Sequence, residues 1–206
     1  MSSLNRTVRA ALAVGAAVAA LAACTSTSPG DPTSAPTTSE DVPTSTSPDS
    51  GGGGGLNLQK YLSDPCAILT KEQQAGLATF REATAGEDGP NGPSCTYQGK
   101  DVLADSTFKV ILVVKGNTIE DFIESTKSGM SISEETEVEG RRAVNFDSAD
   151  GKRTCNTAVG TSDKEAVLVQ GSIGKNDKLN DGKACGTTER VAATVIGNLK
   201  DRKSVV

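Results

Sequence analysis

The stretch TFKVILVV, residues 107–114, is the most apolar and β-branched run between residues 56 and 206. β-Branched and aromatic residues are enriched in strands because they pack well on a pleated surface. A short apolar run of this kind predicts a central strand. The segments on either side of it must therefore supply the strands that pair with it and the helices that cover it.

Four further runs predict strands. They are residues 94–99, residues 134–146, residues 152–160 and residues 166–173. The run 134–146 is either one strand or two strands divided at Gly140. The third of these runs follows an Asp150-Gly151 turn, and Asp-Gly between two such runs is a strong hairpin signal. The strands are grouped rather than alternating with helices, a pattern that favours an antiparallel sheet.

Three segments predict helices. In residues 64–79, Asp-Pro and then a Thr-x-x-Gln capping box are helix-start signals, so a short turn is followed by a helix that ends near Thr79. Residues 118–123 begin a second helix, with Thr118 as its cap and apolar side chains on one face. Residues 188–199 have the i, i+3, i+4 apolar spacing of a third helix.

The order of these elements predicts one α+β domain over residues 56–206. We expect an antiparallel sheet of about five strands with helices packed on one face. Nothing in the order indicates a doubly wound sheet or an internal repeat.

The chain has five cysteines, of which Cys66, Cys95, Cys155 and Cys185 lie in this domain. In an exported chain an even set of four indicates two disulfides, with three possible connectivities. We favour the local pairs Cys66–Cys95 and Cys155–Cys185, because each bridge then joins a terminal helical segment to the sheet. The chain has no histidine and no closely spaced cysteine pair, so we expect no metal site and no cofactor.

The fifth cysteine, Cys24, follows a segment with the layout of a secretory signal. Arg6 and Arg9 precede an apolar run over residues 10–23, which is shorter than the roughly 20 residues of a membrane-spanning helix. Leu-Ala-Ala-Cys at residues 21–24 resembles a bacterial lipobox. That resemblance implies a signal peptide over residues 1–23, cleaved before an acylated Cys24; the alternative is a soluble secreted protein.

Residues 24–55 are predicted to be a disordered tether. Residues 25–55 contain 7 Thr, 7 Ser, 6 Gly and 5 Pro. Such a composition buries too little apolar surface to offset the entropy of ordering it. As a flexible coil the segment has an r.m.s. span of about 30 Å. It is either O-glycosylated or an unmodified spacer.

Charge and composition exclude several classes of function. The net charge is −5, and the domain has no long basic run, so we expect no nucleic-acid partner. Without histidine, Ser-His-Asp and Cys-His catalysis are excluded. A hydrolase would have to depend on carboxylates or lysine, and we assign no catalytic residue.

Three features are weak candidates for a binding site. Glu135, Glu137 and Glu139 fall on one face of a predicted strand, where they could bind calcium or share a proton, or form a solvated charged face. Residues 176–182 hint at a calcium loop but lack its ligand pattern, which favours a plain turn. Tyr61 could line a ligand site, although a packed helix-entry residue is the better interpretation.

Four segments together resemble a known family. They are DPCAILTKEQQAGL (64–77), CTY (95–97), TCNTAVG (154–160) and ACGTTERVAATVIGNL (184–199). The chain from about Leu62 to Leu199 is similar to the actinobacterial lipoproteins that carry domain of unknown function 3558. Tyr97 departs from the Cys-x-Trp often seen there. The resemblance implies a fold and a location, but no activity.

The sequence therefore predicts a lipid-anchored, extracytoplasmic domain at the outer face of the cell membrane. We expect a non-catalytic ligand-binding module, with a concave apolar pocket between sheet and helices. The first alternative is an envelope adaptor that binds another protein through a flat apolar patch. The second is a carboxylate-dependent hydrolase, which needs convergent carboxylates with shifted pKa values in a cleft.

Overall fold

The computed structural model describes residues 56–86, 89–177, 179 and 183–200. The helical elements are the 3₁₀ turns η1 (Gln59–Tyr61) and η2 (Pro65–Ile68) and the α-helices α1 (Lys71–Leu77), α2 (Ile119–Lys127) and α3 (Ala184–Leu199). The strands are β1 (Thr84–Gly86), β2 (Ser94–Tyr97), β3 (Thr107–Val113), β4 (Ile132–Val138), β5 (Arg141–Asp147), β6 (Thr154–Gly160) and β7 (Ala166–Ser172). All of these elements belong to one compact unit.

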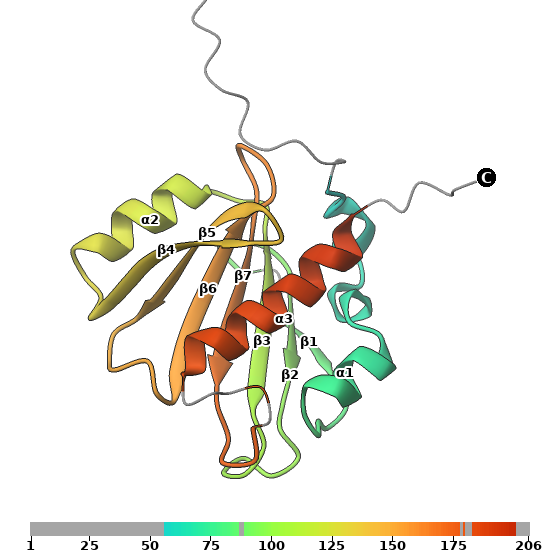
Figure 1. Cartoon of the computed structure of the whole chain (residues 1–206). Helices are drawn as coiled ribbons and strands as arrows, with labels where there is room; N and C mark the ends of the chain where they lie inside the picture. Colours follow the sequence, from blue (N-terminus) through green and yellow to red (C-terminus); the bar gives the residue numbers. More distant parts are fainter. Residues whose placement is uncertain (1–55, 87–88, 178, 180–182, 201–206) are drawn as a thin grey trace, which may run out of the picture. The chain divides into compact units, whose positions relative to one another are not determined.

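The strands form a single antiparallel sheet in the order β1-β2-β3-β7-β6-β5-β4 (Figure 1). β3 lies inside the sheet between β2 and β7, as the apolar run predicts. The sheet has seven described strands rather than about five. One extra strand is β1, a short edge strand whose sequence, Thr-Ala-Gly, has no apolar run to mark it.

The other extra strand arises because residues 134–146 contain a hairpin. Glu139 and Gly140 both have positive φ angles, 54° and 73°. Two successive residues of this kind make the tight turn that matches the twist of antiparallel strands. The turn separates β4 from β5, and the two strands pair along their whole length.

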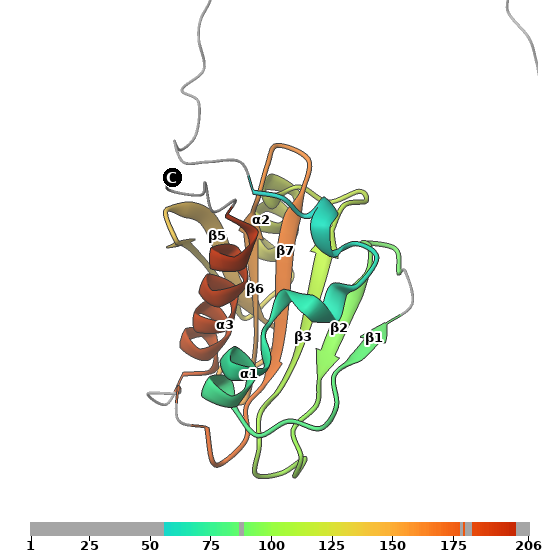
Figure 2. The same ribbon diagram turned by 90° about the vertical axis from the view of Figure 1, so that its right-hand side faces the viewer.

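Helices cover both faces of the sheet. Phe108 and Val110 of β3 belong to a hydrophobic cluster with Val191 of α3. Ile111, which points to the opposite side of the same strand, belongs to a second cluster with Phe122 of α2. The expectation that the helices pack on one face is therefore wrong: α3 crosses one face and α2 covers the other (Figures 1 and 2). A strand buried on both faces is apolar at successive positions rather than alternate ones, which explains the continuous run in β3.

A glycine lets α3 approach the sheet closely. A Cβ atom at Gly171 of β7 would lie 2.4 Å from Cγ2 of Thr188 and 3.4 Å from the ring of Phe108. The absence of a side chain at this position therefore brings helix and strand into contact.

The helix-start signals are confirmed in part. Thr70 and Gln73 form a reciprocal capping box at α1, and Thr118 and Asp121 form one at α2. α1 ends at Leu77, two residues before the predicted end. Asp64 precedes the 3₁₀ turn η2, but its side chain makes no capping hydrogen bond.

Two disulfides join helical segments to the sheet. Cys66 of η2 is bonded to Cys95 of β2, and Cys155 of β6 is bonded to Cys185 of α3. The Cα atoms are 5.0 Å apart in each pair. These are the two local pairs favoured from the sequence.

The described chain begins and ends at the same end of the sheet. Leu56 and Lys200 form an isolated β-bridge. Nζ of Lys200 lies 2.7 Å from a carboxylate oxygen of Glu139, in the β4–β5 turn. We call this end the entry end, because the chain that precedes residue 56 joins the domain there. The β2–β3 loop, residues 98–106, lies at the opposite end, which we call the far end. β3 runs from this loop toward the entry end, where Val113 pairs with Ala166 beside the β6–β7 turn.

Candidate functional site

A groove of about 620 Å³ lies at the entry end of the sheet, on the face that α2 covers. Its walls come from the start of α2, from β4 and β5, and from the β6–β7 turn. We call it the entry groove. Its charged side chains are Glu120, Glu135, Glu137, Arg141, Arg142 and Asp163. Four of them are acidic and two are basic, so their formal net charge is −2.

The floor of the groove depends on close packing between α2 and the end of β6. A Cβ atom at Gly160 would lie 3.0 Å from Cγ2 of Ile119, the first residue of α2. The glycine therefore lets the helix start against the strand. This contact places Glu120 beside the β4–β5 hairpin, where it meets Arg142.

Arg142 is the centre of an ion-pair network in the groove. Its guanidinium lies 2.9 Å from Glu135 and 3.3 Å from Glu120, and Lys127 lies 3.4 Å from Glu135. The hydrogen bond from Arg142 lowers the pKa of Glu135, and the same bond raises the pKa of Arg142. Exposed ion pairs contribute little stability. Their main effect here is to hold the charges of both signs in fixed positions.

Two carboxylates of the groove have no partner among the described residues. Glu137 is opposite Arg142 in the β4–β5 ladder but forms no hydrogen bond or ion pair with it, and Asp163 lies in the exposed β6–β7 turn. Arg141 is engaged, since its guanidinium donates to the carbonyl of Thr161 at 3.0 Å. The groove therefore presents two acidic groups without a partner in the described chain, beside two arginines that are already engaged, Arg142 by carboxylates and Arg141 by a backbone carbonyl.

The acidic trio of the sequence does not converge. Glu135 and Glu137 are on the α2 face of β4, whereas Glu139 is in the turn and pairs with Lys200. Among the residues that the structure describes, no group of Cys, Asp and Glu side chains could hold a metal ion. Glu135 and Glu139 therefore belong to two separate ion-pair systems, and Glu137 belongs to neither.

The predicted turn at 176–182 is described only in part. Asp177 accepts a hydrogen bond from the hydroxyl of Thr187 at 2.9 Å. Residues 178 and 180–182 lie outside the described residues.

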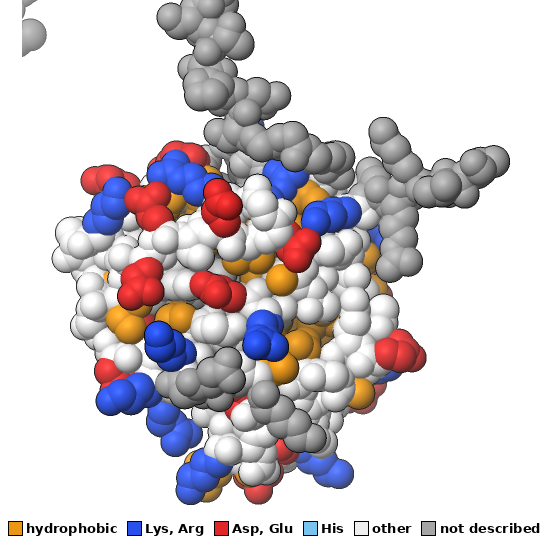
Figure 3. Space-filling model, viewed as in Figure 1, with side chains coloured by type: hydrophobic (Ala, Val, Ile, Leu, Met, Phe, Trp, Pro, Cys, Tyr) orange, Lys and Arg blue, Asp and Glu red, His pale blue; other side chains and the backbone are white. Residues whose placement is uncertain are grey.

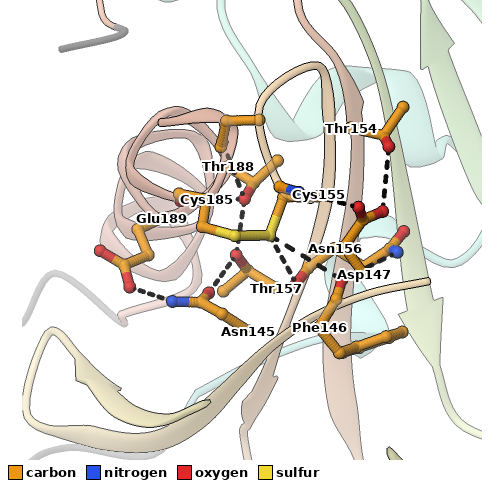
Figure 4. Close-up of a disulfide and its surroundings, with 12 residues drawn as sticks. Asn145, Phe146, Asp147, Thr154, Cys155, Asn156, Thr157, Cys185, Thr188 and Glu189 are labelled. Atoms are coloured by element: carbon orange, nitrogen blue, oxygen red, sulfur yellow. Dashed lines mark hydrogen bonds between the residues drawn. A yellow bond between two sulfur atoms is a disulfide. The ribbon is translucent and has the colours of Figure 1, made fainter. Parts of the chain in front are cut away.

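A second polar cluster lies beside the Cys155–Cys185 disulfide, between β5, β6 and α3 (Figure 4). The hydroxyl of Thr157 is 2.7 Å from both Oδ1 of Asn145 and the hydroxyl of Thr188. The amide of Asn145 also donates to Glu189. Thr157 and Thr188 are fully buried, and buried polar groups are costly unless paired. The cluster therefore links α3 to the sheet in a defined position.

The two tyrosines are packed rather than available to a ligand. Tyr61 is 7% exposed and its hydroxyl donates to the carbonyl of Asn198 at 3.3 Å. Tyr97 is completely buried, and its burial raises its pKa to about 12. Tyr61 is therefore a helix-entry residue, the better of its two interpretations.

The arrangement in the entry groove could not be predicted from sequence spacing. Glu120, Arg142 and Asp163 come from three elements that are far apart in the chain. The acidic run in the sequence includes Glu135 and Glu137 but does not indicate which basic side chains lie beside them. The only available signal was the hairpin register, which places Arg142 opposite Glu137 once the turn at Glu139 is known.

The entry groove differs from the apolar pocket expected of a binding module, because most of the residues that line it are charged. On the face shown in Figure 3, acidic and basic side chains are interspersed and hydrophobic ones show in small areas between them. Cys24 lies outside the described residues. Within the described part of the chain, no helix has the length and apolarity needed to cross a membrane.

Comparison with known proteins gives a family but no relative of known activity. No curated protein and no solved structure matches the chain. Residues 19–198 match a family model described as "Protein of unknown function (DUF3558)". The match spans most of the sequence, and the chain therefore belongs to this family of proteins of unknown function.

Proposed function

We propose that this chain is a lipid-anchored, extracytoplasmic binding domain that takes a small cationic ligand in the entry groove. The anchor is proposed from the Leu-Ala-Ala-Cys sequence at residues 21–24, with Cys24 acylated at the outer face of the cell membrane. The groove supports the binding role, because its volume of about 620 Å³ lies within the usual range of ligand sites.

The charges of the groove favour a ligand that carries an amino or guanidinium group. Arg142 is already neutralised by Glu120 and Glu135, so it offers little to an anion. Glu137 and Asp163 have no partner in the described chain and can each accept hydrogen bonds from a cation. The uncommitted acidic pair is the observation that carries this proposal.

The same geometry favours binding over carboxylate-dependent hydrolysis. A general acid that works near neutral pH needs a raised pKa. Glu135 has a lowered pKa because Arg142 donates a hydrogen bond to it. It therefore remains ionised at neutral pH, which suits a role in fixing Arg142 rather than in donating a proton.

Neutralising Glu137 is expected to weaken binding of a cationic probe. With L-lysine amide as the probe, we expect Glu137→Gln to reduce affinity at least about tenfold, since a hydrogen bond to a charged group is worth about 1.5–3 kcal/mol. The measurement is the rise in unfolding temperature of the detergent-extracted chain as the probe is added. Succinate, a dianion of similar size, should give no rise.

Glu134→Gln is the matched control for this substitution. Glu134 is an exposed glutamate on the same strand, but it faces the α3 side, opposite Asn145. The control should bind L-lysine amide as the unmodified chain does. Equal responses from Glu134→Gln and Glu137→Gln, or a response to succinate, would contradict the proposed ligand class.

Replacing Cys24 by serine is expected to abolish membrane anchoring. Acylation with several chains gives stable attachment, whereas serine has no thiol to modify. The unmodified chain should enter the detergent phase in a Triton X-114 partition. The Cys24→Ser chain should enter the aqueous phase or retain its signal, and mass spectrometry of the N-terminus distinguishes the two.

Ser26→Ala is the control for the anchor, because it changes a neighbouring residue outside the Leu-Ala-Ala-Cys sequence. It should partition with the unmodified chain. Recovery of the unmodified chain in the aqueous phase, with a free N-terminus at another residue, would refute lipid anchoring.

A further inference from the structure

The β2–β3 loop exposes two adjacent aliphatic side chains at the far end of the domain. Val102 is 59% exposed and Leu103 is 67% exposed. Among the described residues, the one other exposed large hydrophobic side chain is Met130, at 38%. Isolated surface hydrophobics are ordinary, but an adjacent pair at the tip of a loop is a candidate contact surface. We call this pair the far tip.

Hydrogen bonds hold the loop in a defined conformation. Oδ1 of Asp101 accepts from the backbone N–H groups of Leu103 and Ala104, at 2.9 and 3.1 Å. Oδ2 of Asp105 accepts from the N–H of Asp101 at 3.0 Å. The carbonyl of Ala104 accepts from the N–H of Asn176 at 2.8 Å. A loop tied down in this way loses little conformational entropy when a partner binds.

A shallow hollow lies beside the base of the same loop. It has a volume of about 510 Å³ and is lined by α1 and by the segment that follows it, including Phe80 and Arg81. The guanidinium of Arg81 donates to the carbonyl of Lys100, which fixes this segment against the loop. The far end therefore offers both a protruding apolar tip and a neighbouring concavity.

The position of the far tip argues for a protein partner rather than the bilayer. The chain that precedes residue 56 joins the domain at the entry end, and the far tip lies at the opposite end of the sheet. Lys100 and Lys175 flank the tip together with Asp101 and Asp105, so its surroundings carry both signs of charge. Segments that insert into anionic membranes are instead predominantly basic. An apolar centre with a charged rim is the pattern of protein interfaces.

We propose that the side chains of Val102 and Leu103 insert into an apolar cleft of an envelope protein. This contact lies on the side of the domain away from the tether. This surface is separate from the entry groove, which lies at the other end of the sheet. The far-tip proposal rests on the proposed extracytoplasmic location but not on ligand binding in the entry groove, so a failure of Glu137→Gln to affect binding of L-lysine amide leaves it standing.

The test combines crosslinking in the cell with binding by purified proteins. A photo-crosslinking amino acid is placed in the full acylated chain at position 102 or 103, and at Lys164 in the β6–β7 turn as the entry-end control. We expect one and the same protein to be crosslinked from both positions of the far tip and not from position 164. That protein, once purified, should bind the unmodified chain.

Charge substitutions then test the contribution of the far tip to this binding. Leu103→Asp should weaken binding of the purified partner at least tenfold, because it puts a carboxylate into an apolar cleft. Met130→Asp, the same kind of change at the other exposed large hydrophobic residue of the described chain, should leave binding unchanged. Lipid adducts alone, adducts to a second copy of this chain, or equal binding by Leu103→Asp would each overturn the proposal.

Discussion

Phe108→Ala is expected to lower the free energy of unfolding by about 3–5 kcal/mol, the usual cost of removing a fully buried phenylalanine. Phe108 is completely buried in β3. Its ring packs edge-on against Phe80 with centroids 6.0 Å apart, and Tyr97 lies opposite it on β2. Truncation leaves a cavity that the disulfide-bonded surroundings cannot readily close. Urea unfolding followed by circular dichroism measures the loss.

Leu103→Ala is the control for this prediction. Leu103 is 67% exposed, so its truncation should change the free energy of unfolding by no more than about 0.5 kcal/mol. The loss in Phe108→Ala is a large fraction of the total stability of a single domain, about 5–15 kcal/mol. A loss below about 1 kcal/mol would show that β3 does not lie at the centre of the core.

Removing the Cys155–Cys185 bridge, by changing both cysteines to alanine, is expected to cost about 3.6 kcal/mol in the chain-entropy model. The bridge spans 30 residues and ties the first turn of α3 to β6. Beside it, the Asn145, Thr157 and Thr188 hydrogen bonds depend on the position of that turn. Unfolding of the double variant and of the unmodified chain in urea gives the difference.

The other disulfide supplies a matched comparison. Cys66 and Cys95 are 29 residues apart, so the entropy of the closed loop is nearly the same. The Cys66→Ala, Cys95→Ala variant should therefore lose a similar amount of stability. A much larger loss at Cys155–Cys185 would assign the excess to the buried polar cluster. A loss below about 1 kcal/mol in both variants would contradict the entropic account.

The sequence predicts the local structure of this domain better than its layers. Thr70 with Gln73 and Thr118 with Asp121 satisfy free N–H groups within one helical turn, so their effect does not depend on the rest of the fold. The apolar run in β3 likewise predicts a strand. The run is apolar on both sides of the pleat, which also indicates that both faces of the sheet are covered. The expectation that the helices pack on one face missed this consequence.

The charge pairs of the candidate site, in contrast, could not be predicted from the sequence. Neighbouring carboxylates in β4 suggested a shared site, yet Glu139 pairs with Lys200, more than 60 positions away in the chain, and Glu135 pairs with Arg142 across the hairpin. An exposed charged side chain pairs with whichever opposite charge the fold brings close to it. Its spacing from other charges in the sequence therefore does not predict its partner. The charge pattern of the entry groove is therefore a property of the assembled sheet.

By itself, the sequence determined the α+β class, the central strand and the capping boxes of α1 and α2, and among three connectivities it favoured the two local cysteine pairs. The capping boxes depend on contacts within one helical turn, and the strand depends on the run of apolar and β-branched side chains along it. Only the tertiary structure decided that α2 and α3 lie on opposite faces, that Glu120, Arg142 and Asp163 meet in one groove, and that the far tip lies at the other end of the sheet from residue 56. These features depend on strand order and direction, because a sheet brings together residues whose separation along the chain is unrelated to their distance in space.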